Sequence, residues 1–327
     1  MIRWIEPDRP ALVLAPMEGV TDAPMRDLQG SFGAFSYGVS EFLRVSNSVL
    51  PAKVFRRSVP ELTTGCRTAS GLPIQVQILG GDPDRMAATA LNAVKAGAEA
   101  IDINFGCPAP IVNRHDGGAS LLRCPERIRE IVSAVRSAVP PAIPVSAKLR
   151  LGWDSCDPIY RNAEMAVEGG ASWLTIHART RIQGYRPPVF WKPIGEVQRA
   201  VGVPVIANGD LWSVDDFHRC QDETGAIHFM LGRPALADPG LAPRIAAELG
   251  LALSVVPVLP WSTLFRSLVD RMGGENRVGH GKSLARLKQW MNLAHQFGEF
   301  PHFAELKLVM NLDELFERLD RLERQAA

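Results

Sequence analysis

The chain of 327 residues has the composition of an ordinary globular protein, with 46% hydrophobic residues, 22% charged residues and a formal net charge of +1. This balance excludes a strongly basic, histone-like nucleic-acid binder, although it is compatible with a local basic patch. Five cysteines without a C-x-x-C pair indicate neither a disulfide framework nor a zinc site. We therefore expect a cytoplasmic protein in a reducing setting, with no metal, no membrane span and a monomeric state.

Eight short apolar runs rich in Val and Ile occur in the first 240 or so residues, and stretches with helical apolar spacing separate most of them. The runs cover residues 11–17, 35–42, 73–79, 100–106, 144–150, 173–179, 203–209 and 227–233. The repeated order of strand and helix predicts an α/β fold, a (β/α)8 TIM barrel over residues 1–248. An open doubly wound sheet is the alternative, but "APMEGVTDA" after the first run is not a G-x-G-x-x-G turn.

Polar or otherwise unusual residues stand at or near the end of each run. In chain order they are Met17 with Glu18, Glu41, Gln77, Asn104, Lys148, His177, Asn208 and Arg233. Active sites of TIM barrels lie where the strands end, so we expect these residues to surround one site. The alternative is that polar residues only mark where the strands stop.

After Leu249 no further strand is indicated, and the helical spacing of 262–272, 281–297 and 312–327 predicts a small all-helical domain over residues 255–327. Its segment 266–288 has a net charge of +4, from six basic and two acidic residues. These are Arg266, Arg271, Arg277, Lys282, Arg286 and Lys288, with Asp270 and Glu275. A basic face here suits an anionic partner, and a solvated helix face is the alternative.

The last two predicted strand ends favour a phosphate site. The loops 208–210 and 232–236 contain glycines and Arg233, which suits a phosphate at the rim of a barrel. Lys148 can offset charge on a cofactor ring, anchor an anion or form a Schiff base. The amides of Gln77 and Asn208 match a planar heterocycle, so these groups together indicate a flavin mononucleotide (FMN) pocket. A structural ion pair for Lys148 and a satisfied buried histidine at His177 are the alternatives.

Cys107 follows the fourth run in the segment "NFGCP", where Gly106 and Pro108 impose an irregular backbone. A free cysteine is most often a buried packing residue. At the rim of a barrel, however, a thiol can also attack a carbon centre or deliver a proton to one. The residues alone leave three roles open: nucleophile, general acid and packing.

Eight motifs between residues 11 and about 240 resemble those of the tRNA-dihydrouridine synthase family and occur in the family's order. They read "APMEGVTD", "VQILG", "INFGCP", "GGASLL", "KLRLGWD", "IHARTRIQGY", "VIANGD" and "MLGRPAL". The segment "ARLKQW" (285–290) extends the likeness into the helical region. The segments "EFLRVSN", "GGASLL" and "GWDS" are similar to those of the bacterial subfamily that modifies uridine 16 of the tRNA D-loop.

The resemblance implies a flavoenzyme that reduces a tRNA uridine to 5,6-dihydrouridine and uses NADPH to reduce FMN. Reduced FMN would give a hydride to C6 of the uracil, and Cys107 would be the general acid that protonates C5. The implied FMN contacts are Pro16, Met17, Glu18, Gln77, Lys148, His177, Asn208, Gly209, Asp210, Gly232 and Arg233. The implied tRNA contacts are Arg44, Asn104, Tyr185, Arg286 and Lys288, with Asn104 on the edge of the base.

Three other functions are also compatible with the sequence. An FMN-dependent oxidoreductase that acts on a free pyrimidine would share the barrel, but it would have no need of a helical appendage. A Schiff-base lyase would use Lys148 and bind no flavin. A non-catalytic RNA-binding protein would keep its RNA affinity without a flavin and without any effect of Cys107.

Overall fold

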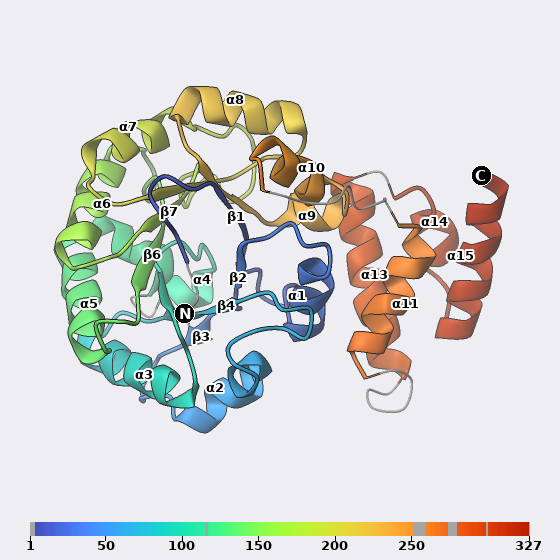
Figure 1. Ribbon diagram of the computed structural model, residues 1–327, viewed down its shortest axis with the longest axis horizontal. Helices are drawn as coiled ribbons and strands as arrows, with labels where there is room; N and C mark the ends of the chain where they lie inside the picture. Colours follow the sequence, from blue (N-terminus) through green and yellow to red (C-terminus); the bar gives the residue numbers. More distant parts are fainter. Residues whose placement is uncertain (1–3, 115–116, 252–258, 274–279, 299, 327) are drawn as a thin grey trace.

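The computed structural model describes residues 4–114, 117–251, 259–273, 280–298 and 300–326. Parallel strands form one closed sheet at the centre of the molecule (Figure 1). They are β1 (Ala11–Leu14), β2 (Tyr37–Val39), β3 (Leu43–Arg44), β4 (Ile74–Leu79), β5 (Ile101–Asn104), β6 (Val145–Arg150), β7 (Leu174–His177), β8 (Val205–Asn208) and β9 (His228–Leu231). β1 pairs with both β2 and β9, and β2 pairs with β4, so the ring closes. The predicted TIM barrel is confirmed.

Helices cover the outside of this ring (Figure 1). They are α1 (Ala23–Gly30), α2 (Ala52–Ser58), α3 (Pro83–Ala96), α5 (Pro125–Ala138), α6 (Pro158–Glu168), α7 (Lys192–Ala200), α8 (Val214–Thr224) and α10 (Leu241–Glu248). Shorter helices lie in the connections between these elements: α4 (Pro110–Asn113), α9 (Arg233–Ala237), η1 (Pro60–Thr63) and η2 (Gly118–Arg123). Local signals set several starts: the side chains of Asp22, Asp82 and Ser213 each accept a hydrogen bond from a backbone N–H in the first helical turn. α3 then ends at Gly97, whose φ of 117° is disfavoured for other residues.

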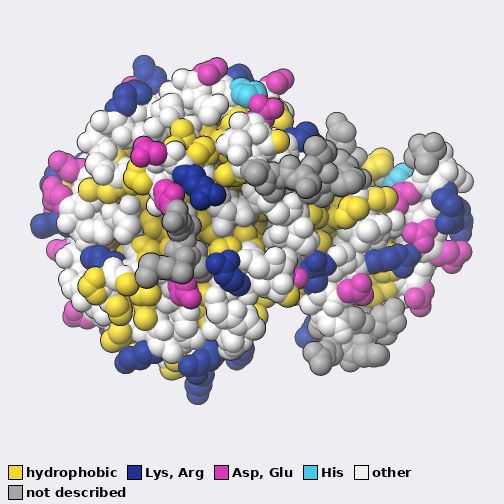
Figure 2. Space-filling view, viewed as in Figure 1, with side chains coloured by type: hydrophobic (Ala, Val, Ile, Leu, Met, Phe, Trp, Pro, Cys, Tyr) yellow, Lys and Arg dark blue, Asp and Glu magenta, His cyan; other side chains and the backbone are white. Residues whose placement is uncertain are grey.

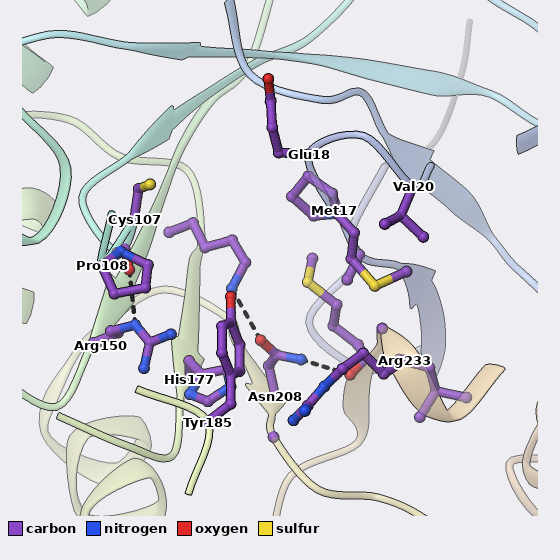
Figure 3. A pocket seen from close by; sticks show the side chains of 18 of the residues that line it. Met17, Glu18, Val20, Cys107, Pro108, Arg150, His177, Tyr185, Asn208 and Arg233 are labelled. Carbon is purple, nitrogen blue, oxygen red and sulfur yellow. Dashed lines mark hydrogen bonds between the residues drawn. The ribbon is translucent and has the colours of Figure 1, made fainter. Parts of the chain in front are cut away.

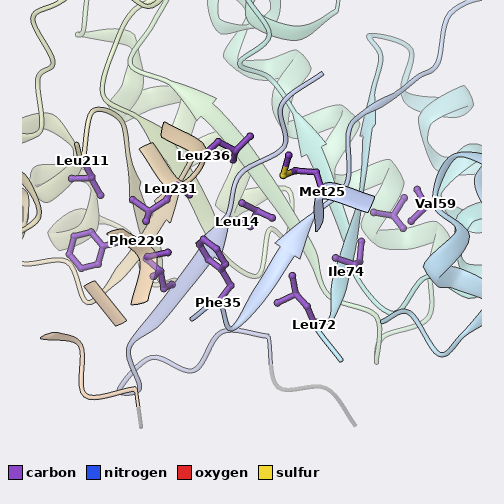
Figure 4. Close-up of a cluster of buried hydrophobic side chains, with 14 of the residues drawn as sticks. Leu14, Met25, Phe35, Val59, Leu72, Ile74, Leu211, Phe229, Leu231 and Leu236 are labelled. Atoms are coloured by element: carbon purple, nitrogen blue, oxygen red, sulfur yellow. The ribbon is translucent and has the colours of Figure 1, made fainter. Parts of the chain in front are cut away.

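Two apolar layers stabilise the barrel. Leucine, isoleucine and phenylalanine side chains fill the space between the strands and the surrounding helices, as around Leu14, Phe35 and Phe229 (Figure 4). Inside the ring, Trp4 packs edge-on against Tyr37, and Tyr37 against Trp173, with ring centroids 5.3 and 6.3 Å apart. Tyr37 begins β2 and Trp173 precedes β7, so these rings lie at the end where the strands begin. A site inside the barrel is therefore accessible from the opposite end.

Two predicted runs differ from the observed strands. The run 35–42 becomes β2 alone, because the backbone N–H of Gln77 donates to the Ser40 hydroxyl (3.1 Å), which takes the place of a backbone acceptor. Strand pairing resumes at β3, beyond the predicted run. The run 227–233 ends early at Leu231, and Arg233 begins α9 instead of ending a strand.

The C-terminal region is helical, as predicted, and packs against one side of the barrel (Figure 1). Its helices are α11 (Trp261–Arg271), α13 (His280–Phe297), α14 (Phe303–Leu306) and α15 (Leu312–Ala326). α13 contacts α9, and α11 contacts α1. The predicted domain boundary at residue 255 lies outside the described residues. Within those residues, no helix has both the length and the apolar character that crossing a bilayer requires.

Three arginines of the segment 266–288 pair with acids, so the segment is less basic than its own charge count predicts. Arg266 pairs with Asp320 at 2.8 Å, Arg271 with Asp27 at 2.8 Å, and Arg286 lies 3.5 Å from Asp22. These acids lie far away along the chain, so a local charge count could not include them. Figure 2 shows acidic and basic side chains intermixed on the visible face of the C-terminal helices. Residues 275 and 277 of the predicted segment lie outside the described residues.

Candidate active site

A cavity of about 340 Å³ opens at the ends of the strands (Figure 3). Trp4, Tyr37 and Trp173 lie at the opposite end of the barrel. The walls of the cavity come from the loops after β1, β5, β7 and β8, from the ends of β6 and β9, and from Leu293 of α13. A volume of this size is typical of small-molecule and cofactor sites. Every predicted cofactor contact except Gln77 lines it: Pro16, Met17, Glu18, Lys148, His177, Asn208, Gly209, Asp210, Gly232 and Arg233. Cys107, Asn104 and Tyr185 line it as well.

Asn208 belongs to one wall of the cavity (Figure 3). A short series of hydrogen bonds joins it to Lys148, which also lines the cavity. Lys148 Nζ donates to Asn208 Oδ1, and Asn208 Nδ2 donates to the carbonyl of Met230, both at 2.9 Å. Burial lowers the pKa of Lys148, and the nearby carboxylate of Asp102 opposes that shift. These hydrogen bonds hold the amine of Lys148, with its lowered pKa, along the wall of the cavity. Among the described residues, Lys148 and Asp102 form no direct ion pair.

Gln77 was expected to contact the cofactor, but it does not line the cavity and lies below it, inside the barrel. It is fully buried, its Nε2 donates to Asp102 Oδ2 at 2.6 Å, and its Oε1 accepts from Asn104 Nδ2 at 2.9 Å. Gln77 lies two residues before the end of β4 at Leu79, and these hydrogen bonds hold its side chain inside the barrel. Its amide supports Asn104 from beneath the cavity.

Asn104 shapes the turn that presents Cys107. Its Oδ1 accepts hydrogen bonds from the backbone N–H groups of Gly106 and Cys107, both at 2.9 Å. With Nδ2 bound to Gln77 as well, the side chain is largely committed to protein contacts. In this structure Asn104 therefore acts as a positioning residue for the cysteine, which differs from the predicted contact with a base.

Cys107 is half-buried at the cavity wall, and the Gly-rich loop after it packs closely behind. The Cys107 carbonyl accepts from the backbone N–H of Ala119 at 3.1 Å. Gly118 has φ +61°, and a Cβ there would lie 2.9 Å from the Cys107 carbonyl oxygen, so only glycine suits this position. Burial raises the pKa of the Cys107 thiol. The group is therefore a protonated thiol at neutral pH, which suits a proton donor better than a thiolate nucleophile.

Arg150 is a site residue that the sequence reasoning missed. It is buried, and its guanidinium donates to the carbonyls of Gly106 (2.7 Å), Gly184 (2.8 Å) and Thr180 (3.2 Å). It thereby ties the Cys107 turn to the loop that carries Tyr185, whose ring centroid lies 5.2 Å from the guanidinium carbon. A signal was present, because the predicted run 144–150 ends at Arg150 and not at Lys148.

His177 and Tyr185 form the wall next to Arg150 (Figure 3). Burial and the neighbouring cations lower the pKa of His177 well below its usual value, so the ring is neutral. Its Nδ1 is buried and has no hydrogen-bond partner among the described residues. Tyr185 is 54% exposed, and its ring lies edge-on to His177 with centroids 6.2 Å apart. Tyr185 therefore stands at the mouth of the cavity and His177 deeper within it.

Arginines surround the end of the cavity formed after β8 and β9. The buried Arg179 binds both carboxylate oxygens of Asp210, and Arg233 Nη2 lies 3.6 Å from Asp210 Oδ1. Asp210 (φ 50°) and Gly209 (φ 125°) both have left-handed backbone conformations. Asp210 orients the arginines around it, while Gly209 and Gly232 leave open backbone along the cavity.

Three predicted tRNA contacts, Arg44, Arg286 and Lys288, do not line the cavity. Arg44 donates to the carbonyl of Ile111 at 3.0 Å, beside the Cys107 loop. Arg286 is only 8% exposed, and it donates to the carbonyl of Val20, so it joins α13 to the loop after β1 and does not form an open surface. Lys288 is half-buried on the same helix. No group of His, Cys, Asp and Glu within the described residues has a metal-binding arrangement.

Two proteins with known names match the chain over most of its length. The chain is 42% identical over 318 residues to the tRNA-dihydrouridine(16) synthase of Ralstonia nicotianae, covering 97% of this chain and 96% of that protein. It is 41% identical to the enzyme of the same name from Aquipseudomonas alcaligenes, covering 95% and 98%. Both relatives therefore match it over almost their whole length.

Solved structures support the fold. An old yellow enzyme homologue from Zymomonas mobilis superimposes with a TM-score of 0.51 at 14% identity, covering 78% of this chain and 93% of that chain. A morphinone reductase variant in complex with tetrahydroNAD gives a TM-score of 0.50 at 14% identity, covering 78% and 89%. The family model for dihydrouridine synthase (Dus) matches residues 13–323. The chain belongs to the dihydrouridine synthase family.

Proposed function

We propose that the protein reduces uridine 16 in the D-loop of tRNA to 5,6-dihydrouridine, with FMN as its cofactor and NADPH as the reductant. The observation that carries this proposal is the place of Cys107 at the wall of a cofactor-sized cavity, where burial raises the pKa of its thiol. The full-length similarity to two tRNA-dihydrouridine(16) synthases supports the substrate and the position.

The donor set of the cavity fits FMN. Lys148 offers a cation and Asn208 an amide to the polar edge of an isoalloxazine ring, and the unpartnered Nδ1 of His177 offers a further polar contact. Arg233 and the open backbone at Gly209 and Gly232 suit the phosphate. The alternative function, a lyase that forms a Schiff base on Lys148, has less support because the amine is hydrogen-bonded to Asn208.

The residues of the chain supply position and one proton. The chemistry that bound, reduced FMN supplies is a hydride to C6 of the uracil. The thiol of Cys107 then gives its proton to C5, and the turn held by Asn104 keeps the sulfur at the cavity wall. Arg150 fixes the backbone of the same turn through Gly106. General acid catalysis by a positioned side chain contributes about 10²–10⁴-fold to a rate.

The target uridine must leave its stack to reach the cavity. Tyr185, exposed at the mouth, offers a ring face or a hydroxyl to the extruded nucleotide. The rim beyond it carries Trp153 between two arginines, with Arg123 at 4.2 Å and Arg181 at 4.6 Å from the ring centroid. Such guanidinium groups suit the phosphates of a strand that enters the cavity.

Arg44 and Lys288 extend the proposed RNA contact to either side of the cavity. We also propose that the chain works as a monomer in the cytoplasm, and that its barrel domain (residues 1–248) carries the chemistry. The helical domain (residues 255–327) then adds contacts with the folded tRNA. With Arg266, Arg271 and Arg286 paired to acids, recognition depends on shape more than on a uniformly basic surface.

A direct test uses the purified full-length protein. We expect a yellow protein that, with NADPH, forms dihydrouridine in an unmodified tRNA transcript and leaves free uridine and uracil unchanged. Reduction of the free pyrimidines at a similar rate would contradict the RNA substrate. Tight tRNA binding without flavin and without product would instead indicate a non-catalytic RNA-binding protein.

A further inference from the structure

Arg233 lies among three aromatic side chains that come from separate parts of the chain. Its guanidinium carbon is 4.7 Å from the ring centroid of Tyr185, 5.3 Å from that of Trp212 and 4.9 Å from that of Phe297. Trp212 and Phe297 also stack on each other, with centroids 5.3 Å apart and an interplanar angle of 15°. A guanidinium held over ring faces keeps its charge but loses freedom to turn away from the cavity.

Phe297 belongs to the last turn of α13, so the C-terminal region takes part in this arrangement. Trp290 Nε1 of the same helix donates to the carbonyl of Leu236 in α9 at 2.8 Å. Gly298 approaches α9 so closely that a Cβ there would lie 2.2 Å from the carbonyl oxygen of Ala237. Because α9 begins at Arg233, these two contacts hold Phe297 at a fixed place relative to the arginine.

The charge of Arg233 is only partly balanced by the protein. Its one ion pair among the described residues is the 3.6 Å contact with Asp210, and Arg179 already binds both oxygens of that carboxylate. Both Arg233 and Leu293, one turn before Phe297 on α13, line the cavity. A partly desolvated cation with spare hydrogen-bond donors therefore faces a site that can hold an anionic group.

We propose that Phe297 and Trp212 are positioning residues that hold Arg233 toward the phosphate of the bound flavin, so that helix α13 completes the cofactor site. The inference rests on the proposed use of FMN. It gives the C-terminal region a role in retaining the cofactor, separate from any contact with RNA. If Phe297 holds Arg233 in this way, loss of Phe297 must weaken binding of the flavin phosphate more than binding of the flavin ring.

The test compares FMN with riboflavin, which has the same ring system and lacks the phosphate. Full-length protein freed of flavin is titrated with each compound, and the change in flavin fluorescence gives the two dissociation constants. We expect the parent to prefer FMN, and Phe297→Ala to weaken FMN about tenfold while changing riboflavin less than about twofold. Phe297→Leu, which keeps bulk without a ring face, should behave like Phe297→Ala, and Phe297→Tyr like the parent.

Phe316→Ala is the matched control, because it removes an aromatic ring 4.1 Å from another arginine, Arg266, away from the cavity. It should leave the preference for FMN unchanged. The inference is overturned if Phe297→Ala weakens both flavins equally, if it leaves the preference intact, or if Phe297→Leu binds as the parent does. A parent that binds neither flavin would overturn the proposed function itself, and one that binds both equally would overturn only the role of Arg233.

Discussion

Among single residues, the proposed proton transfer depends most on the protonation state and placement of Cys107. Burial keeps its thiol protonated, and Asn104 fixes the backbone on both sides of Gly106. Asn104 was expected to contact the uracil base, and instead it holds the turn that carries the proposed acid, Cys107. A small rearrangement of this turn would move the sulfur away from the substrate without changing the cofactor pocket.

Cys107→Ala should lower the rate of dihydrouridine formation by about 10²–10⁴-fold, because it removes the proton donor to C5. Flavin content and tRNA affinity should stay at the parent's values, since neither depends on the thiol. Single-turnover assays with pre-reduced enzyme measure the step directly. A variant that reduces tRNA as fast as the parent would exclude the acid role.

The pH dependence of that step follows from the direction of the pKa shift. A raised thiol pKa extends the range of the proton-donating form toward higher pH, so the single-turnover rate should be flat near neutrality and fall only on the alkaline side. Cys107→Ser supplies a comparison, because its hydroxyl does not ionise in this range. An alkaline fall of equal size in both proteins would assign it to another group.

At the scale of elements, much of the site was predictable because strand ends and loops follow local sequence rules. Lys148, His177 and Asn208 stand where apolar runs stop, and they do meet in one cavity. Gln77 lies two residues before the end of β4, as Lys148 lies two residues before the end of β6, but its amide binds Asp102 and Asn104 below the cavity. Hydrophobic periodicity predicts the strand, but it does not predict which buried side chains bind one another inside the barrel.

Contacts between distant elements were not predictable. The basic segment 266–288 looked available for RNA, yet the acids that pair with Arg271 and Arg286 lie in and before α1. The packing of α13 on α9, which puts Phe297 beside Arg233, likewise leaves no local signal. Both depend on how the C-terminal helices dock, and a single sequence contains no direct measure of docking.

Gly298→Ala tests that docking. Its Cβ would meet the Ala237 carbonyl at 2.2 Å, so α13 and α9 must separate, and we expect a loss of about 1–3 kcal/mol in the free energy of unfolding. Gly202→Ala is the control, because nothing lies within 4 Å of a Cβ there. Thermal or denaturant unfolding measures the stability of the two variants. Equal stability of the two variants would mean that the contact between α13 and α9 is not close in solution.

In the whole molecule, the C-terminal helices pack against the barrel beside the cavity. Trp4, Tyr37 and Trp173 fill one end of the barrel and the cavity lies at the other, so we expect substrate and cofactor to enter from the same end. Leu293 brings the C-terminal region into the wall of the cavity. A bulky RNA substrate would meet the barrel rim and the helices together, which suits selection of one uridine by the shape of the tRNA.

The central claim, reduction of one D-loop uridine, is tested most directly by mapping dihydrouridine in tRNA. tRNA from a strain lacking this protein should lose dihydrouridine at position 16 and keep it elsewhere, and the parent chain should restore it while Cys107→Ala should not. Unchanged dihydrouridine at position 16, or loss only at a different position, would contradict the account.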